Sequence, residues 1–119
     1  MNNNSKKICV FPNDPLKSYF IKGEIKERYF NPENYFDEIH VISLFDDEID
    51  EDNVKELAGN AIIKIHRIGK VNLLNYKKFY NKIFDVVKEI NPLLIRAYNP
   101  LIQGWLATKI AKKLGIPIV

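Results

Sequence analysis

The sequence is poor in the residues that build disulfide frameworks or membrane anchors. Its single cysteine, Cys9, lies in a short apolar run and has no partner for an internal disulfide, which fits a reducing, cytosolic environment best. No stretch approaches the roughly twenty consecutive apolar residues of a membrane-spanning helix. The first apolar run, Ile8–Phe11, is too brief for the core of a signal peptide. We therefore expect a cytoplasmic protein that is soluble, or at most peripheral at a membrane.

Glycine is also scarce, with five in the chain, and none forms a nucleotide-binding motif. A dinucleotide site needs Gly-x-Gly-x-x-Gly after the first strand, because glycine lets the backbone approach the pyrophosphate closely. That pattern is absent, as is the Gly-x-x-x-x-Gly-Lys-Ser/Thr of phosphate-binding loops. We accordingly expect no NAD, FAD or other bound cofactor.

The sequence shows no metal-binding pattern either. His40 and His66 are far apart in the chain, without a cysteine or acidic partner at metal spacing, and we expect both to be ordinary strand residues. The acidic run 46–52 lacks the glycine and terminal glutamate of a calcium loop. No metal site is predicted.

The charges nearly balance, with 18 basic and 15 acidic residues and a net charge of +3. This excess is too small to indicate a nucleic-acid partner, although it is compatible with an anionic small molecule or an anionic membrane. With 46% hydrophobic residues over 119 positions, the composition is that of one folded globular domain.

Apolar runs alternate with segments of helical period, which is typical of an open, doubly wound parallel α/β sheet. The pattern predicts five strands, at residues 8–11, 39–44, 61–65, 93–97 and 116–119. It predicts helices at 18–30, 54–58, 76–90 and from 99 to 114, with Asn75 and Asn99 as N-caps and Gly59 and Gly115 as C-terminal stops. With right-handed crossovers the strand order is 3-2-1-4-5, a Rossmann-like arrangement.

In such sheets a ligand binds beyond the carboxyl ends of the strands, where the order reverses direction. Here that point lies between the first and fourth strands, so the loops that follow them are expected to border one crevice. The candidate binding residues are Asn13, Asp14, Lys17, Arg96, Tyr98 and Asn99. Several have structural alternatives: Asn-Asp-Pro is common turn chemistry, Lys17 suits a solvated surface, Asn99 suits a helix cap, and Arg96 is equally consistent with a buried pairing role.

Two stretches resemble the group 1 glycosyltransferases, which have the GT-B fold. One consists of Gly23–Pro32 and Phe36–Ile42. The other consists of Pro92–Leu101, Gly104 and Ala111–Pro117. The resemblance implies that residues 1–119 are the N-terminal, acceptor-side domain, ending within the fifth strand. The donor domain and its paired glutamates would be absent, so catalysis by this chain alone is not expected.

The same resemblance implies a complete enzyme that transfers a sugar from a nucleotide-sugar donor, with retention and without a metal required for the fold. The acceptor would be a sugar or a lipid-linked molecule bound by this domain. Two alternatives remain open: a stand-alone flavodoxin-like binding module without catalytic activity, and a basic nucleic-acid binder, which the charge balance makes the weakest interpretation.

A set of basic residues interleaved with aromatic side chains suggests contact with anionic lipid. The basic members are Lys64, Arg67, Lys70, Lys77, Lys78 and Lys82, and the aromatic ones are Tyr76, Phe79 and Tyr80. The alternative is a solvated helix face. Trp105 is expected in the core or at a domain interface rather than under a sugar ring.

Overall fold

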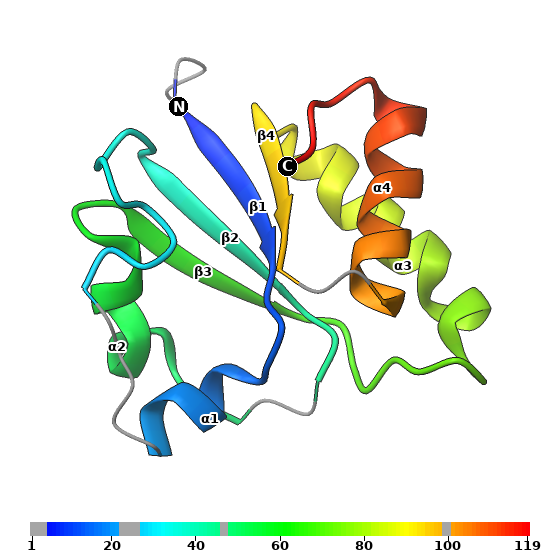
Figure 1. The fold of residues 1–119 in the computed structure, drawn as a ribbon, viewed down its shortest axis with the longest axis horizontal. Coiled ribbons are helices and arrows are strands. Elements are labelled where there is room, and N and C mark those ends of the chain that lie inside the picture. Colours follow the sequence, from blue (N-terminus) through cyan, green and yellow to red (C-terminus); the bar gives the residue numbers. More distant parts are fainter. Residues whose placement is uncertain (1–4, 22–26, 46–47, 99–100) are drawn as a thin grey trace.

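Four parallel strands form the sheet of this protein, as a computed structural model describes it for residues 5–21, 27–45, 48–98 and 101–119. The strands are β1 (Lys7–Phe11), β2 (Glu38–Ser43), β3 (Ile62–Arg67) and β4 (Leu94–Ala97). Their order is β3-β2-β1-β4 (Figure 1). The predicted Rossmann-like class and the order of these four strands are confirmed.

The last residues of the chain occupy the fifth position beside β4, although they do not form a full strand. The Ile95 N–H donates to the Pro117 carbonyl at 2.9 Å, and the Val119 N–H donates to the Ile95 carbonyl at 3.0 Å. A single parallel bridge joins Ile95 to Ile118. The predicted fifth strand is thus reduced to an isolated bridge.

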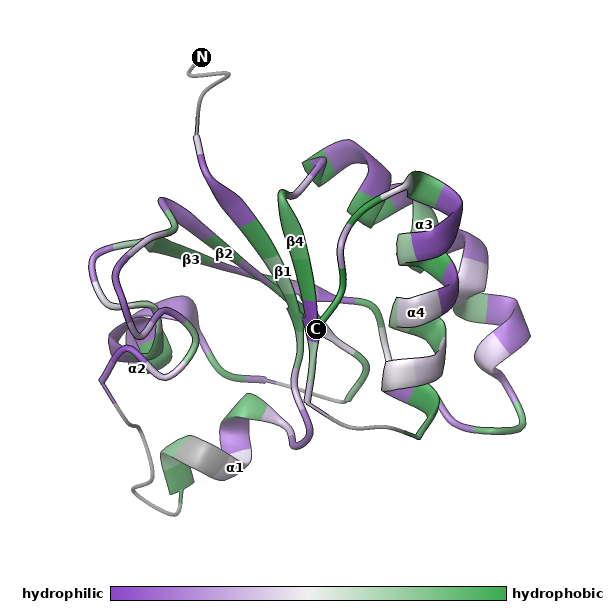
Figure 2. Cartoon of the chain, turned by 45° about the horizontal axis from the view of Figure 1, so that its top comes forward, coloured by the Kyte–Doolittle hydropathy of each residue, from purple (hydrophilic) through white to green (hydrophobic). Residues whose placement is uncertain are grey.

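Helices cover both faces of the sheet, because successive residues of each buried strand point to opposite sides. One face carries α1 (Leu16–Ile21), α2 (Glu51–Val54) and the 3-10 helix η1 (Lys55–Ala58) over Ile8, Val10, Ile39 and Val41. The other carries α3 (Tyr76–Ile90) and α4 (Ile102–Leu114) over Cys9, Phe11, Ile42 and Ile95. Figure 2 shows hydrophobic and hydrophilic residues alternating around α3 and α4, as expected for helices with one buried side.

The predicted helix over 18–30 is wrong in its second half. Helix α1 ends at Ile21, and residues 27–30 form a turn in which Arg28 has φ 61. Here the Arg28 and Phe30 N–H groups donate to the carbonyls of Glu56 and Leu57, at 2.7 and 2.8 Å. These hydrogen bonds to η1 take the place of helical hydrogen bonds, and the Phe30 side chain is completely buried. Gly23 lies outside the described residues.

Helix α3 has the predicted bounds, and Asn75 stands at its N-cap position as predicted, but not as a capping side chain. The Asn75 side chain makes no capping bond and instead accepts the Asn72 N–H at 2.8 Å. The Asn72 side-chain oxygen takes the N–H groups of Leu74 and Asn75, at 2.9 and 3.2 Å. Asn72 therefore organises the entry to α3.

Both predicted glycine stops are confirmed. Gly59 ends η1 with φ 63, and Gly115 ends α4 with φ 70. The short helical segment predicted over 54–58 begins earlier, at Glu51, because the acidic residues of its first turn favour the positive end of the helix dipole.

Candidate functional site

The carboxyl ends of β1 and β4 lie together, as the switch-point argument requires. Val10 pairs with Arg96 and Phe11 with Ala97. The Tyr98 N–H then donates to the Phe11 carbonyl at 3.0 Å, so the two following loops leave the sheet side by side.

A hollow of about 550 Å³ opens at this point, on the side of α4. Its lining residues are Ala97, Tyr98, Gly104, Trp105, Thr108, Ile118 and Val119. The volume falls within the range of small-molecule sites. Its walls are mainly apolar, with the Thr108 hydroxyl as a polar side-chain group.

Of the predicted residues, Tyr98 lies in this hollow. Its ring also stacks on Tyr29, with centroids 5.6 Å apart, and contacts the Phe30 ring at 5.6 Å. Burial raises the pKa of the Tyr98 phenol, and the hydrogen bond and charge of Arg96 oppose that rise. Arg96 is half-buried, and it pairs with Tyr98, which is the structural role left open for it.

The remaining predicted residues do not converge on the same hollow. Asn13 and Asp14 are exposed after β1. Lys17 lines a different hollow of about 300 Å³, with Phe20, Glu48 and Asp50 among its neighbours. Asn99 lies outside the described residues.

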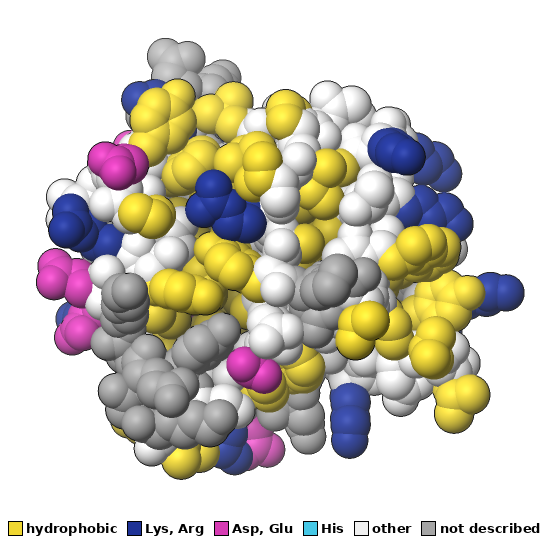
Figure 3. Space-filling model, in the orientation of Figure 1, with side chains coloured by type: hydrophobic (Ala, Val, Ile, Leu, Met, Phe, Trp, Pro, Cys, Tyr) yellow, Lys and Arg dark blue, Asp and Glu magenta, His cyan; other side chains and the backbone are white. Residues whose placement is uncertain are grey.

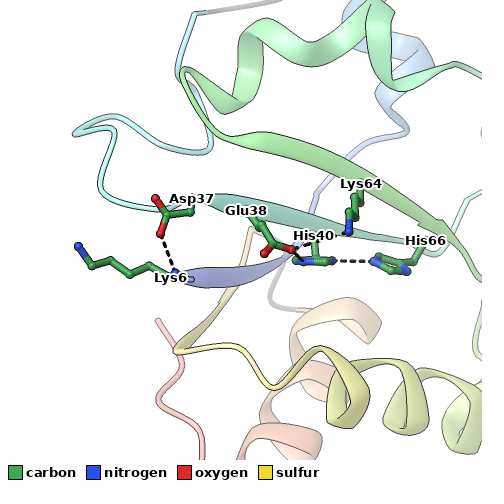
Figure 4. Close-up of polar contacts among 6 residues, drawn as sticks. All are labelled: Lys6, Asp37, Glu38, His40, Lys64 and His66. Atoms are coloured by element: carbon green, nitrogen blue, oxygen red, sulfur yellow. Dashed lines mark hydrogen bonds and ion pairs between the residues drawn. The ribbon is translucent and has the colours of Figure 1, made fainter. Parts of the chain in front are cut away.

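A second cluster of polar residues lies on β2 and β3, and sequence reasoning missed it (Figure 4). His40 and His66 are strand residues, as predicted, but they are not isolated from each other, because His40 Nδ1 is 2.9 Å from His66 Nε2. His40 Nε2 is 3.0 Å from Glu38 Oε1. The parallel register places His40 beside Lys64 and Ile42 beside His66, which brings the two imidazoles together diagonally. The available signal was the spacing of two residues between Glu38 and His40 and between Lys64 and His66.

Hydrogen-bond chemistry sets the tautomers of this cluster. The Glu38 carboxylate can only accept hydrogen bonds, so His40 Nε2 carries a proton. In the neutral His40 ring, Nδ1 carries no proton and accepts a hydrogen bond from the protonated Nε2 of His66. His66 Nδ1 is then left with a lone pair. The three side chains form a continuous hydrogen-bonded chain.

Burial lowers the pKa of both histidines, and the His40 and Lys64 charges lower that of His66 further, to about 4. Burial would raise the pKa of Glu38, but the hydrogen bond and charge of His40, with Lys7 and Lys64, outweigh it and hold that pKa below its ordinary value. At neutral pH the cluster consequently holds two neutral imidazoles and one carboxylate.

Within the described part of the chain, no three His, Cys, Asp or Glu side chains are placed to hold a metal ion. Cys9 is buried, and burial raises its pKa to about 12, so it stays a thiol with little nucleophilic character. The described residues therefore offer neither a metal-ligand cluster nor a reactive thiol.

The basic residues predicted to contact anionic lipid fall into two groups in the structure, those that face acidic side chains and those exposed on α3. Lys64 lies 3.9 Å from Glu38, and Arg67 lies 3.7 Å from Glu51, so these two face acidic partners. Lys77 and Lys78 are exposed on α3. Trp105, expected in a core or interface, is 49% exposed beside them. None of the described helices is long and apolar enough to cross a membrane.

No protein-family profile and no curated protein matches the sequence. Among solved structures, the chain is similar to the C-terminal domain of a hydrogenase from Pyrococcus furiosus. The TM-score is 0.58 and the identity 14%, over 100% of this chain and 92% of that one. Identity this low shows a shared fold alone. The chain is therefore a Rossmann-like α/β domain.

Proposed function

We propose that this chain is the acceptor-binding domain of a glycosyltransferase that uses a nucleotide-sugar donor. The observation that carries the proposal is the hollow of about 550 Å³ at the joined ends of β1 and β4. It is the position at which open α/β sheets bind their ligands. The resemblance of Gly23–Pro32 and Pro92–Leu101 to group 1 glycosyltransferases supports the substrate class.

The lining of the hollow suits a sugar. Trp105 presents aromatic surface to the apolar C–H groups of a pyranose ring, and the Thr108 hydroxyl group can exchange hydrogen bonds with its hydroxyls.

The donor and the groups that activate it belong, in this proposal, to a second domain. The buried Cys9 and the neutral histidine pair lie away from the hollow, and neither is assigned a role in sugar transfer. The chain by itself would bind an acceptor without converting it, and in the complete enzyme transfer would proceed with retention.

Saturation-transfer NMR with a panel of alkyl glycosides tests the proposal directly. We expect transfer to at least one glycoside, and its loss in Trp105→Ala and Arg96→Ala, because the first removes an aromatic wall and the second removes the partner of Tyr98. Lys17→Ala is the matched control, since Lys17 lines the other hollow.

Two results would contradict the assignment. One is the absence of transfer to every glycoside in the panel. The other is transfer that Lys17→Ala abolishes while Trp105→Ala leaves it intact, which would move the site to the hollow beside α1.

A further inference from the structure

An exposed apolar surface lies at the N-terminal ends of α3 and α4, and we call it the apolar cap. Its members are Leu73, Leu74, Tyr76, Leu101, Ile102 and Trp105. Leu74 is 98% exposed and Leu73 is 74% exposed. A groove of about 430 Å³ runs between the two helix ends and is lined by every member except Leu74. Hydrophobic side chains gather over these helix ends in Figure 3.

The two leucines are held outward by the fold. Asn72 accepts the N–H groups of Leu74 and Asn75, and the Asn75 side chain donates to the Lys70 carbonyl at 3.0 Å. This tight turn prevents the leucines from folding back. Exposing large apolar side chains to water is unfavourable, so a cluster of them indicates a surface that meets an apolar phase.

Lysines surround the apolar cap, without acidic neighbours in the sequence. Residues 70–84 carry four lysines and residues 101–119 carry three, and neither segment contains an aspartate or glutamate. The lysine ammonium groups lie over aromatic rings: Lys109 is 5.1 Å from the Tyr80 centroid and 5.0 Å from that of Trp105. Lys113 is 5.2 Å from the Phe84 centroid. The Trp105 ring thus holds one lysine at the apolar cap itself, and the Tyr80 and Phe84 rings hold lysines further along the two helices.

The near-neutral total charge conceals a strong separation along the chain. Residues 1–60 contain 7 basic and 13 acidic side chains, whereas residues 61–119 contain 11 basic and 2 acidic ones. On the face shown in Figure 3, acidic side chains lie away from the apolar cap, towards α1, α2 and the middle of the molecule. The apolar cap therefore lies on the positive side of the protein.

We propose that the apolar cap docks on an anionic membrane surface. Leu73, Leu74 and Trp105 would enter the boundary between headgroups and acyl chains, and the surrounding lysines would face the lipid phosphates. Lysines near such a surface strengthen the binding through attraction to the anionic headgroups. Charge of one sign around protruding leucines matches a lipid surface better than a flat protein partner, which would need matching acidic groups and a pocket for Leu74.

The docked surface adjoins the hollow at the end of β4, because Trp105 lines both. Under the proposed function, this contact specifies a lipid-linked acceptor whose sugar reaches the hollow from the membrane. That last step depends on the proposed function, whereas membrane docking does not.

Trp105 is the chain's single tryptophan, so its fluorescence reports on the apolar cap itself. We expect phosphatidylcholine vesicles containing phosphatidylglycerol to shift its emission to shorter wavelength and to sediment the protein. Pure phosphatidylcholine vesicles should do neither. Added salt should weaken binding, because exposed charges are screened beyond about 10 Å at 0.1 M and about 3 Å at 1 M ionic strength.

The double variant Leu73→Ser/Leu74→Ser should lose affinity for the anionic vesicles by at least about tenfold, since 1.4 kcal/mol corresponds to that factor. Leu93→Ser is the matched control, because Leu93 is 52% exposed and lies just before β4, at the opposite end of the sheet. Lys77→Glu/Lys78→Glu should also weaken binding, whereas Lys55→Glu on η1 should not.

Three results would overturn the proposal: no emission shift with anionic vesicles, equal binding to both vesicle types, or binding that the double leucine variant retains. The proposal would also fail if, without vesicles, the emission shifted with protein concentration and sedimentation velocity showed a dimer. In that case the apolar cap would be the contact surface for a second copy of the chain. Vesicle binding needs no glycoside and glycoside NMR needs no vesicle, so failure of either proposal is distinguishable from failure of the other.

Discussion

At the scale of single residues, the alternation of side chains along β2 and β3 places a polar cluster beside the residues of the core. Glu38 and His40 point to one side of β2, the side from which Ile42 enters the core beneath α3 and α4. Lys64 and His66 on the neighbouring strand complete a polar group at the margin of that core. Its two imidazoles are neutral because little water reaches them to stabilise the charged form.

The depressed pKa values make stability depend on pH. An unfolded histidine binds a proton below about pH 6.5, whereas His66 in the folded chain does so at about 4. Between these values the unfolded state binds more protons, so stability is complete above about pH 6.5 and falls as the pH is lowered towards 4. Urea unfolding at pH 7.5 and pH 5 should show a loss of roughly 1 kcal/mol, after allowing for partial exposure of the ring.

His66→Gln should reduce this loss, because glutamine does not titrate. The groups that face His66 are His40, Lys64 and, more distantly, Glu51. The Glu38 and Glu51 pKa values are lowered, so their contributions disappear only at more acidic pH. A variant with an unchanged slope between pH 5 and 7.5 would show that the histidine pair does not control it.

The two glycine stops provide a second test at the scale of residues. A Cβ on Gly59 would collide with the Asn34 side-chain oxygen and come within 2.7 Å of Arg28 Cγ, whereas one on Gly115 would meet nothing within 4 Å. Both glycines have positive φ, which costs an alanine about 1 kcal/mol. Gly59→Ala should therefore cost more than about 2 kcal/mol of unfolding free energy and Gly115→Ala about 1. Equal losses in urea unfolding would contradict the predicted collision.

Among the elements, helical period alone predicts α3 and its bounds, because its buried residues recur at helical spacing on one side. The same reasoning failed for residues 27–30, which also look helical in isolation. There the backbone bonds to η1 and the aromatic side chains pack on Tyr98. Contacts with segments distant in the chain outweighed local propensity.

Asn31 fixes that segment against η1. Its amide nitrogen donates to the Phe36 and Ala58 carbonyls at 3.1 and 3.0 Å, its oxygen accepts the Phe36 N–H at 3.1 Å, and the residue is 1% exposed. Asn31→Ala should cost about 2–3 kcal/mol, because it removes the side-chain partner of the Phe36 N–H and carbonyl groups and one of the two hydrogen bonds of the Ala58 carbonyl. Asn81→Ala on the exposed side of α3 should cost almost nothing in the same denaturation experiment, and a similar loss in both variants would refute this role.

At the scale of the whole molecule, the two halves of the chain differ in charge and cover different faces of one sheet. The acidic half supplies α1, α2 and η1, whereas the basic half supplies α3 and α4. The switch point between β1 and β4 is where these halves meet. The hollow there and the apolar cap share Trp105, so sugar binding and membrane docking are proposed for adjoining surfaces that can be tested separately.

The sequence by itself determined the fold class, the strand order and the location of the switch point. These follow from the alternation of apolar strands with helices and from the handedness of the crossovers, both of which are local or general properties. Tertiary structure alone decided that His40 meets His66, that Arg96 pairs with Tyr98, that Lys17 faces another hollow and that Leu73 and Leu74 stay exposed. Those outcomes depend on the register between strands and on the packing of helix ends, where residues far apart in the chain become neighbours and no short-range pattern specifies the distance.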